Sequence, residues 1–306
     1  MEAAYHSTVI EVVSVNGVVT EASEARISPL DRGFLYGDSV YETIRTYNGR
    51  PFRLGPHLDR LRRSADAIGI DAGNAPVDPA AAVDAALARG GFPESAVRVI
   101  LSRGQGGIGY DDAACGPPTI VVHVRACPPI PDAWRREGVD VAIVPVRRNA
   151  AAALDPAIKS SNLLNNLLAW RAGQRLGVYE PILLDAEGRL TEGASSNLFL
   201  VREGRVSTPS LEVGILRGIT RDAVLDLARA HGLGAEEAPL PAPWLASADE
   251  AFLTSTLKGV LPIRRVDGWP VREGRPGPVT RRLADLYDAL TQAETKAGSM
   301  PGATLR

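Results

Sequence analysis

Three prolines in the stretch CPPIPDAW divide this chain of 306 residues near its middle. They are Pro128, Pro129 and Pro131. Because proline has no backbone N–H and a fixed φ angle, neither a helix nor a central strand continues through such a stretch. The chain is long enough for two domains, each with its own hydrophobic core. We therefore predict an N-terminal domain over residues 1–125, a linker over 126–133 and a C-terminal domain over 134–306.

The first half of the chain carries two hairpin signals. Apolar residues alternate around Asn16-Gly17 and again around Asn48-Gly49, and Asn-Gly is the pair that tight hairpin turns favour. The stretches SAVRVILSRG and PTIVVHVRA are rich in β-branched residues and predict two further strands. Together these patterns predict a sheet in the N-terminal domain.

Helices are predicted beside that sheet. From Pro56 onward, Leu58, Leu61, Ala65 and Ile68 recur on one helical face. An alanine-rich segment over 79–89 predicts a second helix. We expect the first of these helices to pack on the sheet.

The second half mixes strand and helix patterns. Strands are predicted in VDVAIVPVRR, EPILLD, SNLFLVREGRVST and EAFLTST, and helices in NLLNNLLAWRAGQRLG, TRDAVLDLARAHGL and GPVTRRLADLYDAL. Strands dominate the middle with helices between them, so the predicted class is α+β, or mixed α/β. The tail after Lys296 is predicted to be weakly ordered.

Composition narrows the class of partner. Hydrophobic residues make up 45% of the chain and charged residues 23%, and the formal net charge is -2. Nucleic acids and anionic membranes require a basic face, so we expect a small-molecule ligand, no nucleic acid and no membrane. Cys115 and Cys127 form no metal-ligand spacing with the four histidines, which predicts no metal site. Few cysteines, no signal-peptide pattern and no window as long as a membrane span predict a cytoplasmic protein.

One lysine has a setting that permits chemistry. Lys159 lies in DPAIKSSNLLNN, between an apolar approach and two serines, directly before a predicted helix. Most lysines are exposed, and the local window alone favours a surface residue. A lysine that forms a Schiff base needs a carbonyl partner, usually pyridoxal phosphate. It also needs an anion site for the phosphate and a carboxylate for the ring nitrogen.

Two other motifs offer those groups. LRGITRD places Ile219 and Thr220 at a predicted helix start, where free N–H groups favour a phosphate, although an ordinary threonine cap looks the same. RLTEGASSNLFLV places Glu192 in a turn of small residues between two strand segments. A glutamate there is either a solvated turn residue or the carboxylate that keeps a pyridine nitrogen protonated.

In their order along the chain, Lys159, TEGASSN, GITR and TST resemble the motifs of the class IV aminotransferases. These are pyridoxal-phosphate enzymes of the two-domain D-amino-acid aminotransferase fold, fold type IV. The N-terminal stretch LDRGFLYGDSVYETIRTYNGRPFRL is similar to the same family, so the resemblance covers nearly the whole chain. It implies a homodimer that moves an amino group between an amino acid and a 2-oxo acid, with pyridoxal 5'-phosphate as cofactor.

The resemblance also implies roles for single residues. Lys159 forms the Schiff base with the cofactor and moves the proton between the substrate Cα and the cofactor. Glu192 faces the pyridine nitrogen. Residues that hold the phosphate are implied to be Arg53 in PFRL, Ile219, Thr220, Ser255 and Thr256.

The implied substrate pocket lies partly on one predicted strand. Tyr41 stands where the family places an aromatic side chain, and Thr43 and Arg45 share its face because strand side chains alternate. A buried substrate carboxylate requires a paired cation or several donors. Arg45, Arg98 and the loop of TSTLKG with Lys258 are alternatives for that role.

Substrate handling departs from the three subfamilies that share this scaffold. KSSNLLNNLLA and EGASSN resemble the D-amino-acid enzymes and the related (R)-amine enzymes, but Ile108 and Tyr110 replace the Arg and His of their carboxylate trap. Leu163 replaces a tyrosine of the branched-chain enzymes. Arg98 corresponds to a lysine of the aminodeoxychorismate lyases. We expect a transaminase of broad range for D- or branched-chain amino acids and (R)-amines, with 2-oxoglutarate or pyruvate as acceptor. The alternative is a lyase that releases 4-aminobenzoate and pyruvate.

Overall fold

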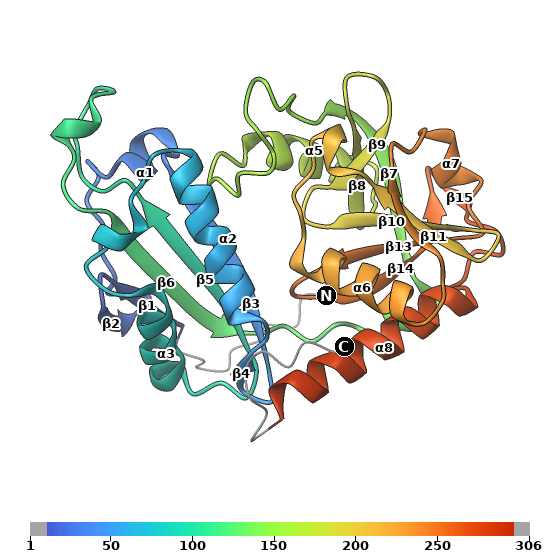
Figure 1. The fold of residues 1–306 in the computed structure, drawn as a ribbon, viewed down its shortest axis with the longest axis horizontal. Coiled ribbons are helices and arrows are strands. Elements are labelled where there is room, and N and C mark those ends of the chain that lie inside the picture. Colours follow the sequence, from blue (N-terminus) through green and yellow to red (C-terminus); the bar gives the residue numbers. More distant parts are fainter. Residues whose placement is uncertain (1–10, 297–306) are drawn as a thin grey trace. The chain divides into compact units, whose positions relative to one another are not determined.

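A computed structural model describes residues 11–296, which belong to two compact units, Met1–Pro128 and Pro129–Arg306 (Figure 1). The division falls inside the predicted linker, and helix α4 (Asp132–Glu137) begins before that linker was expected to end. The weakly ordered tail predicted after Lys296 lies outside the described residues.

The first unit is built on a six-stranded antiparallel sheet with the order β2-β1-β6-β5-β3-β4. Its strands are β1 (Val12–Val15), β2 (Val18–Glu21), β3 (Ser39–Tyr47), β4 (Arg50–Pro51), β5 (Ser95–Ser102) and β6 (Thr119–Ala126). Its helices are α1 (Arg32–Tyr36), α2 (Leu54–Ala67) and α3 (Pro79–Gly90), with short 3-10 turns η1 (Ala72–Asn74) and η2 (Asp112–Ala114).

Both predicted hairpins are confirmed. Asn16 and Gly17 connect β1 to β2, Asn48 and Gly49 connect β3 to β4, and all four residues have positive φ angles. A two-residue turn of this kind needs positive φ at both positions, which asparagine and glycine tolerate best. The Asn-Gly pairs therefore fix the register of both hairpins.

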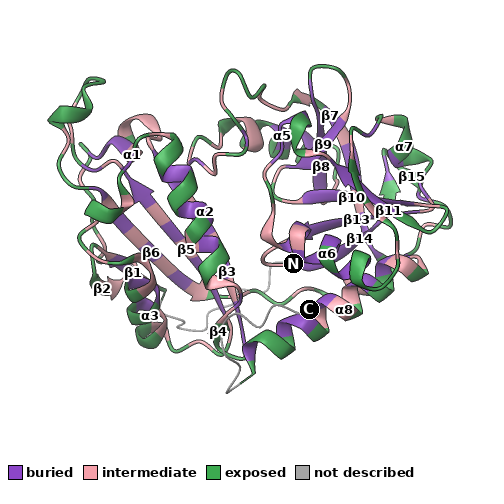
Figure 2. Cartoon of the chain, viewed as in Figure 1, coloured by how far each residue is buried: buried purple, intermediate pink, exposed green. Residues whose placement is uncertain are grey.

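The two faces of this sheet differ. Helices α2 and α3 lie against one face, where β3, β5 and β6 present fully buried valines such as Val97, Val99 and Val122. The alternate residues, among them Tyr41 and Thr43, are half-buried on the opposite face, and Figure 2 shows this banding along β5 and β6. One face is thus packed and the other is open to a ligand.

Helix α2 begins at Leu54, two residues before the predicted start at Pro56. The first-turn N–H groups of a helix have no partner within it, so proline fits at the third position as well as at the first. The buried face also contains His57 and Arg60, which the apolar pattern did not mark. Both are bound to a buried carboxylate described below.

The second unit is a sheet that closes on itself. The strand order is β12-β11-β10-β13-β14-β7-β8-β9, and β9 also pairs with β10 through Glu192 and Asn197. Its strands are β7 (Val139–Arg147), β8 (Glu180–Leu184), β9 (Leu190–Gly193), β10 (Asn197–Arg202), β11 (Arg205–Pro209), β12 (Ala235–Ala238), β13 (Glu250–Ser255), β14 (Gly259–Val266) and β15 (Trp269–Pro270). Its other helices are α5 (Leu164–Arg175), η3 (Leu211–Val213), α6 (Ile219–Ala230), α7 (Pro243–Ala246) and α8 (Pro278–Thr295).

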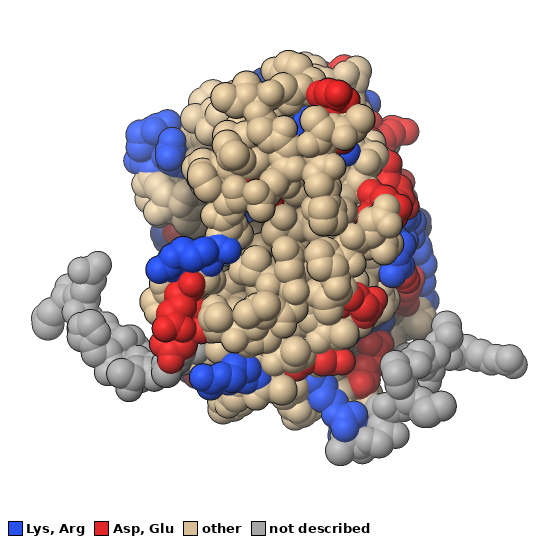
Figure 3. Space-filling view, turned by 90° about the vertical axis from the view of Figure 1, so that its left-hand side faces the viewer, with Lys and Arg blue, Asp and Glu red and all other residues tan. Residues whose placement is uncertain are grey.

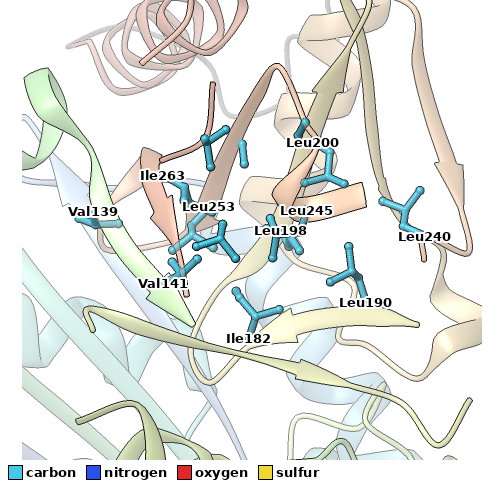
Figure 4. Packing of buried hydrophobic residues seen from close by; sticks show 14 of the residues in the cluster. Val139, Val141, Ile182, Leu190, Leu198, Leu200, Leu240, Leu245, Leu253 and Ile263 are labelled. Carbon is cyan, nitrogen blue, oxygen red and sulfur yellow. The ribbon is translucent and has the colours of Figure 1, made fainter. Parts of the chain in front are cut away.

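The closed sheet has a branched aliphatic core. Figure 4 shows Val141, Ile182, Leu198 and Leu253 from different strands meeting in one cluster of buried residues. Outside it, α5 packs on β7 and β8, with Leu183 among its buried contacts. Since the barrel is filled with aliphatic side chains, chemistry is left to the strand ends and the turns that connect them.

Three observations on the described residues concern possible partners. No helix within 11–296 is long and apolar enough to cross a membrane. Acidic and basic side chains are interspersed on the face that Figure 3 shows. Within the same residues, no group of three or more His, Cys, Asp or Glu side chains is arranged to hold a metal ion.

Candidate active site

Glu192 is a buried carboxylate at the end of β9, with 5% of its surface exposed. Its Oε1 lies 2.9 Å from Nη2 of Arg148. Its Oε2 accepts hydrogen bonds from the backbone N–H of Leu216 at 3.1 Å and from Nδ2 of Asn197 at 3.2 Å. The sequence analysis placed Glu192 in a turn, which is wrong by two residues. Glu192 pairs with Asn197 as a strand residue, and the turn begins at Ala194.

Burial and the neighbouring charges act in opposite directions on the pKa of Glu192. Burial raises the pKa of the Glu192 carboxyl, while Arg148, the Leu216 amide and the positive charge of Lys159 act against that rise. A buried carboxylate stays ionised only when cations or donors replace the water that it has lost. The structure therefore brings Lys159 and Glu192 into one electrostatic environment, with Arg148 as the partner in direct contact.

Lys159 is half-buried and lies in the segment that leads into α5. Two asparagines in the first turn of this helix connect it to the neighbouring strands. Arg148 donates to Asn165 and Asn166, at 3.3 Å in each case, and Asn166 donates from Nδ2 to the Ala194 carbonyl at 2.8 Å. The helix that follows the lysine and the strand that carries Glu192 are thus joined by direct hydrogen bonds.

Helix α6 begins at Ile219, as GITR predicted. Its N-cap is Gly218, which has no side chain to accept a hydrogen bond from the first-turn N–H groups. A Cβ at Gly218 would overlap Oδ1 of Asn197, which makes glycine necessary there. Helix N-termini of this kind bind anions through their N–H groups and the helix dipole. The residues present therefore fit a phosphate.

The second turn of interest connects β13 to β14. Ser255 is the last residue of β13, and Thr256 follows it; both are half-buried. In the same turn, Nζ of Lys258 lies 4.9 Å from the ring centroid of Tyr179. Burial lowers the pKa of Lys258, and the Glu180 carboxylate opposes this.

In the first unit, Arg53 directly precedes α2 and has left-handed backbone angles, with φ of 54°. Its guanidinium lies 5.3 Å from the ring centroid of Phe52. Behind it, the buried Glu42 carboxylate binds Nε of Arg60 at 2.6 Å and Nδ1 of His57 at 2.7 Å. These two hydrogen bonds fasten the start of α2 to β3 and so determine where Arg53 stands.

The open face of the first sheet carries the predicted substrate residues. Tyr41, Thr43 and Arg45 alternate with buried residues along β3, as expected. Arg98 on β5 pairs with Thr43, and its guanidinium lies 3.9 Å from the ring centroid of Tyr41. Arg45 lies 4.6 Å from the Tyr47 ring. The sheet therefore brings Arg98 and Tyr41 together, while Arg45 stacks on another aromatic residue.

Four residues of this arrangement were missed by the sequence analysis: Arg148, Asn166, Asn197 and Glu180. Arg148 ends the basic pair that follows the strand VDVAIVPV, which is the one local signal that marked it. The asparagines stand in quoted motifs, but amide side chains are common in turns and caps. Glu180 opens a strand that otherwise reads as an apolar run.

Sequence similarity to named proteins extends over both units of the chain. The model of the class IV amino-transferase family matches residues 39–266. A relative from Methanocaldococcus jannaschii, provisionally named a branched-chain-amino-acid aminotransferase, is 36% identical over 278 residues, which cover 90% of this chain and 94% of the relative. The D-alanine aminotransferase of Bacillus licheniformis is 32% identical over 285 residues, or 92% of this chain and 98% of its own.

Solved structures show the same likeness. The branched-chain amino acid aminotransferase of Escherichia coli has a TM-score of 0.87 at 30% identity, covering 94% of this chain and 97% of that one. A second branched-chain amino acid aminotransferase, solved with pyridoxamine 5'-phosphate, has a TM-score of 0.85 at 29% identity and covers 92% of this chain and 94% of its own. Both likenesses extend over the two units.

Proposed function

Because the chain belongs to the class IV aminotransferases, which use pyridoxal phosphate to exchange an amino group between an amino acid and a 2-oxo acid, we propose that Lys159 is its catalytic residue. When bound, the cofactor supplies an electron-accepting ring. Lys159 holds the cofactor covalently and, once released, moves a proton at the substrate Cα through its Nζ. The observation that carries this role is the placement of Lys159 in the field of the buried Glu192–Arg148 pair.

Glu192 would bind the pyridine nitrogen of the cofactor and keep it protonated. Its partner Arg148 neutralises the charge of the carboxylate, which favours the ionised form although the group is buried. Leu216 and Asn197 fix both the direction and the rotamer of the same carboxylate through its second oxygen. A carboxylate held at one position before the cofactor arrives loses little conformational entropy on binding it.

The phosphate of the cofactor would bind at the start of α6. The backbone N–H groups of Ile219 and Thr220, in the first turn of this helix, would donate to it, and the hydroxyls of Ser255 and Thr256 are proposed to join them. The family resemblance implies Arg53 as the cation for the phosphate. Support for this comes from the glycine N-cap of α6, which has no side chain of its own to compete for the first-turn N–H groups.

For the substrate, we assign the carboxylate to Arg98. Of the three candidate cations, Lys258 already acts on the buried Glu180 carboxylate, and Arg45 stacks on the buried ring of Tyr47, which is not a residue of the implied substrate pocket. Arg98 stands beside the aromatic ring of Tyr41 on the open sheet face. A guanidinium over an aromatic ring keeps its edge available for a carboxylate. The substrates proposed are D-amino acids or branched-chain amino acids, with a broad range.

The enzyme is proposed to act as a cytoplasmic homodimer. Leu164, Leu167 and Leu168 recur on one side of α5 and are exposed, although a contiguous apolar helix face is usually covered. Cys115 and Cys127 are both free, which suits a reducing compartment. Sedimentation of the holoenzyme tests the dimer: a monomer at micromolar concentration would contradict it.

One experiment tests the reaction and its substrates. D-Alanine, D-glutamate, L-leucine and an (R)-amine are added one at a time to the holoenzyme without acceptor, and the visible absorption of the cofactor is followed. Loss of that absorption with several of them is expected. Strict use of a single amino acid would contradict the broad range. No change with any of them, together with pyruvate release from aminodeoxychorismate, would replace the transaminase by the lyase.

A further inference from the structure

A second buried carboxylate lies close to Glu192 and has no part in the reaction described above. Glu180 is the first residue of β8 and has 1% of its surface exposed. Its Oε1 accepts from the backbone N–H of Ser195 at 2.7 Å, from Oγ of Ser195 at 3.1 Å and from Oγ of Ser196 at 2.9 Å. All three donors belong to the turn that follows Glu192.

The hydrogen bonds of Glu180 fix one peptide group in particular. The Ala194–Ser195 peptide donates its N–H to Glu180 at 2.7 Å and accepts at its C=O from Asn166 at 2.8 Å. A peptide plane held from opposite sides cannot rotate without breaking one of the two bonds. The Glu180 carboxylate also lies so close to Gly193 that a Cβ there would be 2.5 Å from Oε1.

This turn has Glu192 before it and Asn197 after it. Asn197 donates to the Glu192 carboxylate and also to the Leu216 carbonyl. Rotation of the turn would therefore shift both Glu192 and the side chain that orients it. A turn rich in glycine, alanine and serine has little side-chain packing of its own to prevent such rotation.

Glu180 also acts on the turn between β13 and β14. The charge of Lys258 lowers the pKa of the Glu180 carboxyl, although burial raises it more strongly. The ammonium of Lys258 is held over the ring of Tyr179, the residue directly before Glu180. One carboxylate is thus bound to the turn after Glu192 and attracts the turn that contains Thr256.

We propose that Glu180 is a positioning residue, which fixes the Ala194–Ser195 peptide and thereby holds Glu192 against the pyridine nitrogen of the cofactor. This inference rests on the role proposed for Glu192. A buried carboxylate is costly, and an apolar side chain of similar volume would fill the start of β8 at lower cost. What the carboxylate provides is three hydrogen bonds to one turn, which no apolar residue can supply.

The consequence for the cofactor is electrostatic. A protonated pyridine nitrogen withdraws electrons from the ring and disfavours a second proton on the nitrogen that links the cofactor to Lys159. If Glu192 moves away, the pyridine nitrogen loses its proton and the pKa of the linking nitrogen rises. The pH at which the visible absorption of the bound cofactor changes should therefore move upward.

The experiment compares Glu180→Leu and Glu180→Gln with Glu250→Gln as the control. Glu250 is also a buried carboxylate bound by two backbone N–H groups, those of Val279 and Thr280, but it caps α8. For each variant the pH midpoint of the cofactor absorption, the dissociation constant of pyridoxal 5'-phosphate, the turnover rate and the thermal unfolding of the cofactor-free protein are measured.

Glu180→Leu should raise the pH midpoint by about half a unit or more and lower kcat about tenfold. Glu180→Gln, whose amide oxygen still accepts from Ser195, should show smaller changes in the same direction. Glu250→Gln should lower thermal stability and leave the midpoint unchanged. The proposal is overturned if the Glu180 variants keep the midpoint of the unmodified enzyme, or if Glu250→Gln shifts it equally.

Two further variants separate the possible failures. If Glu180→Leu does not fold, Ser196→Ala removes one donor to the same carboxylate and should move the midpoint in the same direction. Glu192→Gln tests the underlying role. An unchanged midpoint in Glu192→Gln would refute the role proposed for Glu192, whereas a shift there without one in the Glu180 variants would refute this inference alone.

Discussion

The Arg148 guanidinium binds the Glu192 carboxylate at 2.9 Å, and both side chains are nearly buried. Arg148 directly follows β7 and Glu192 is on β9, so two residues more than forty positions apart in sequence form one ion pair. Burial raises the pKa of the Glu192 carboxyl, and the charge of Arg148 is the largest of the effects that oppose this rise.

Replacement of Arg148 by methionine should leave the Glu192 carboxylate buried without its cation. Removal of one partner of a buried ion pair costs about 3–5 kcal/mol of unfolding free energy. We expect that loss in urea unfolding of the cofactor-free protein, together with weaker binding of pyridoxal 5'-phosphate. The neighbouring Arg147 is exposed, and Arg147→Met is the control. Equal behaviour of the two variants would show that the pair does not keep Glu192 ionised.

The stability of the first unit should fall in acid because of Glu42. Burial raises the pKa of the Glu42 carboxyl, but hydrogen bonds and charges from Arg60 and His57 outweigh it and bring the pKa to about 2. Because the folded pKa is lower than the unfolded pKa of 4.5, the ionised carboxylate stabilises the fold at pH values above 4.5. This stabilisation is lost as the pH falls toward 2. The contribution is about 3 kcal/mol at neutral pH. Glu42→Gln should therefore be destabilised at pH 7 and much less so near pH 2. The same difference in urea unfolding at both pH values would contradict the assignment.

Addition of one methyl group at Gly218 should impair phosphate binding. The alanine Cβ would overlap Oδ1 of Asn197, so the start of α6 or the Asn197 side chain must shift. We expect Gly218→Ala to weaken the binding of pyridoxal 5'-phosphate by at least about tenfold, while the affinity for pyridoxal, which has no phosphate, stays nearly unchanged. Gly116→Ala is the matched control, since a Cβ there meets nothing closer than 3.7 Å. An equal loss for both ligands would place the phosphate elsewhere.

Arg98→Met should raise KM for the amino acid and for the 2-oxo acid. Loss of a charged partner for a carboxylate costs about 2–3 kcal/mol, which corresponds to a rise of about thirtyfold or more. Arg45→Met and Lys258→Met serve as comparisons, because each removes one of the alternative cations. The assignment would fail if Lys258→Met or Arg45→Met raised KM more than Arg98→Met does.

Much of the fold could be predicted from local patterns. The Asn-Gly turns, the strands β5, β6, β8 and β13, and the helices α3, α5, α6 and α8 all stand where the sequence placed them. Each depends on turn chemistry or on hydrophobic periodicity, which neighbouring residues alone determine. The family followed from the order of the motifs and the α+β class from the mix of strand and helix patterns, and the comparisons confirm both.

Other features depend on contacts between distant residues. Strand β14 contains Pro262, which argues against a strand in the middle of a sheet, yet β14 pairs with both β13 and β7. The β7 pairing begins at Ile263, so Pro262 precedes it and pairs only with Phe252 of β13. The roles of Arg148 and Glu180 arise only when the second unit closes. A single sequence contains no local pattern that predicts such contacts between distant residues.

The central claim is that Lys159 carries the cofactor. The chain contains three lysines, Lys159, Lys258 and Lys296, so the site of attachment can be identified without ambiguity. The holoenzyme is reduced with borohydride and digested, and the masses of the peptides are measured by mass spectrometry. The variant Lys159→Ala is treated in the same way. We predict one reduced pyridoxyl phosphate group, on the peptide that contains Lys159, and none in the variant. A label on Lys258 or Lys296, or an unchanged label in Lys159→Ala, would contradict the account.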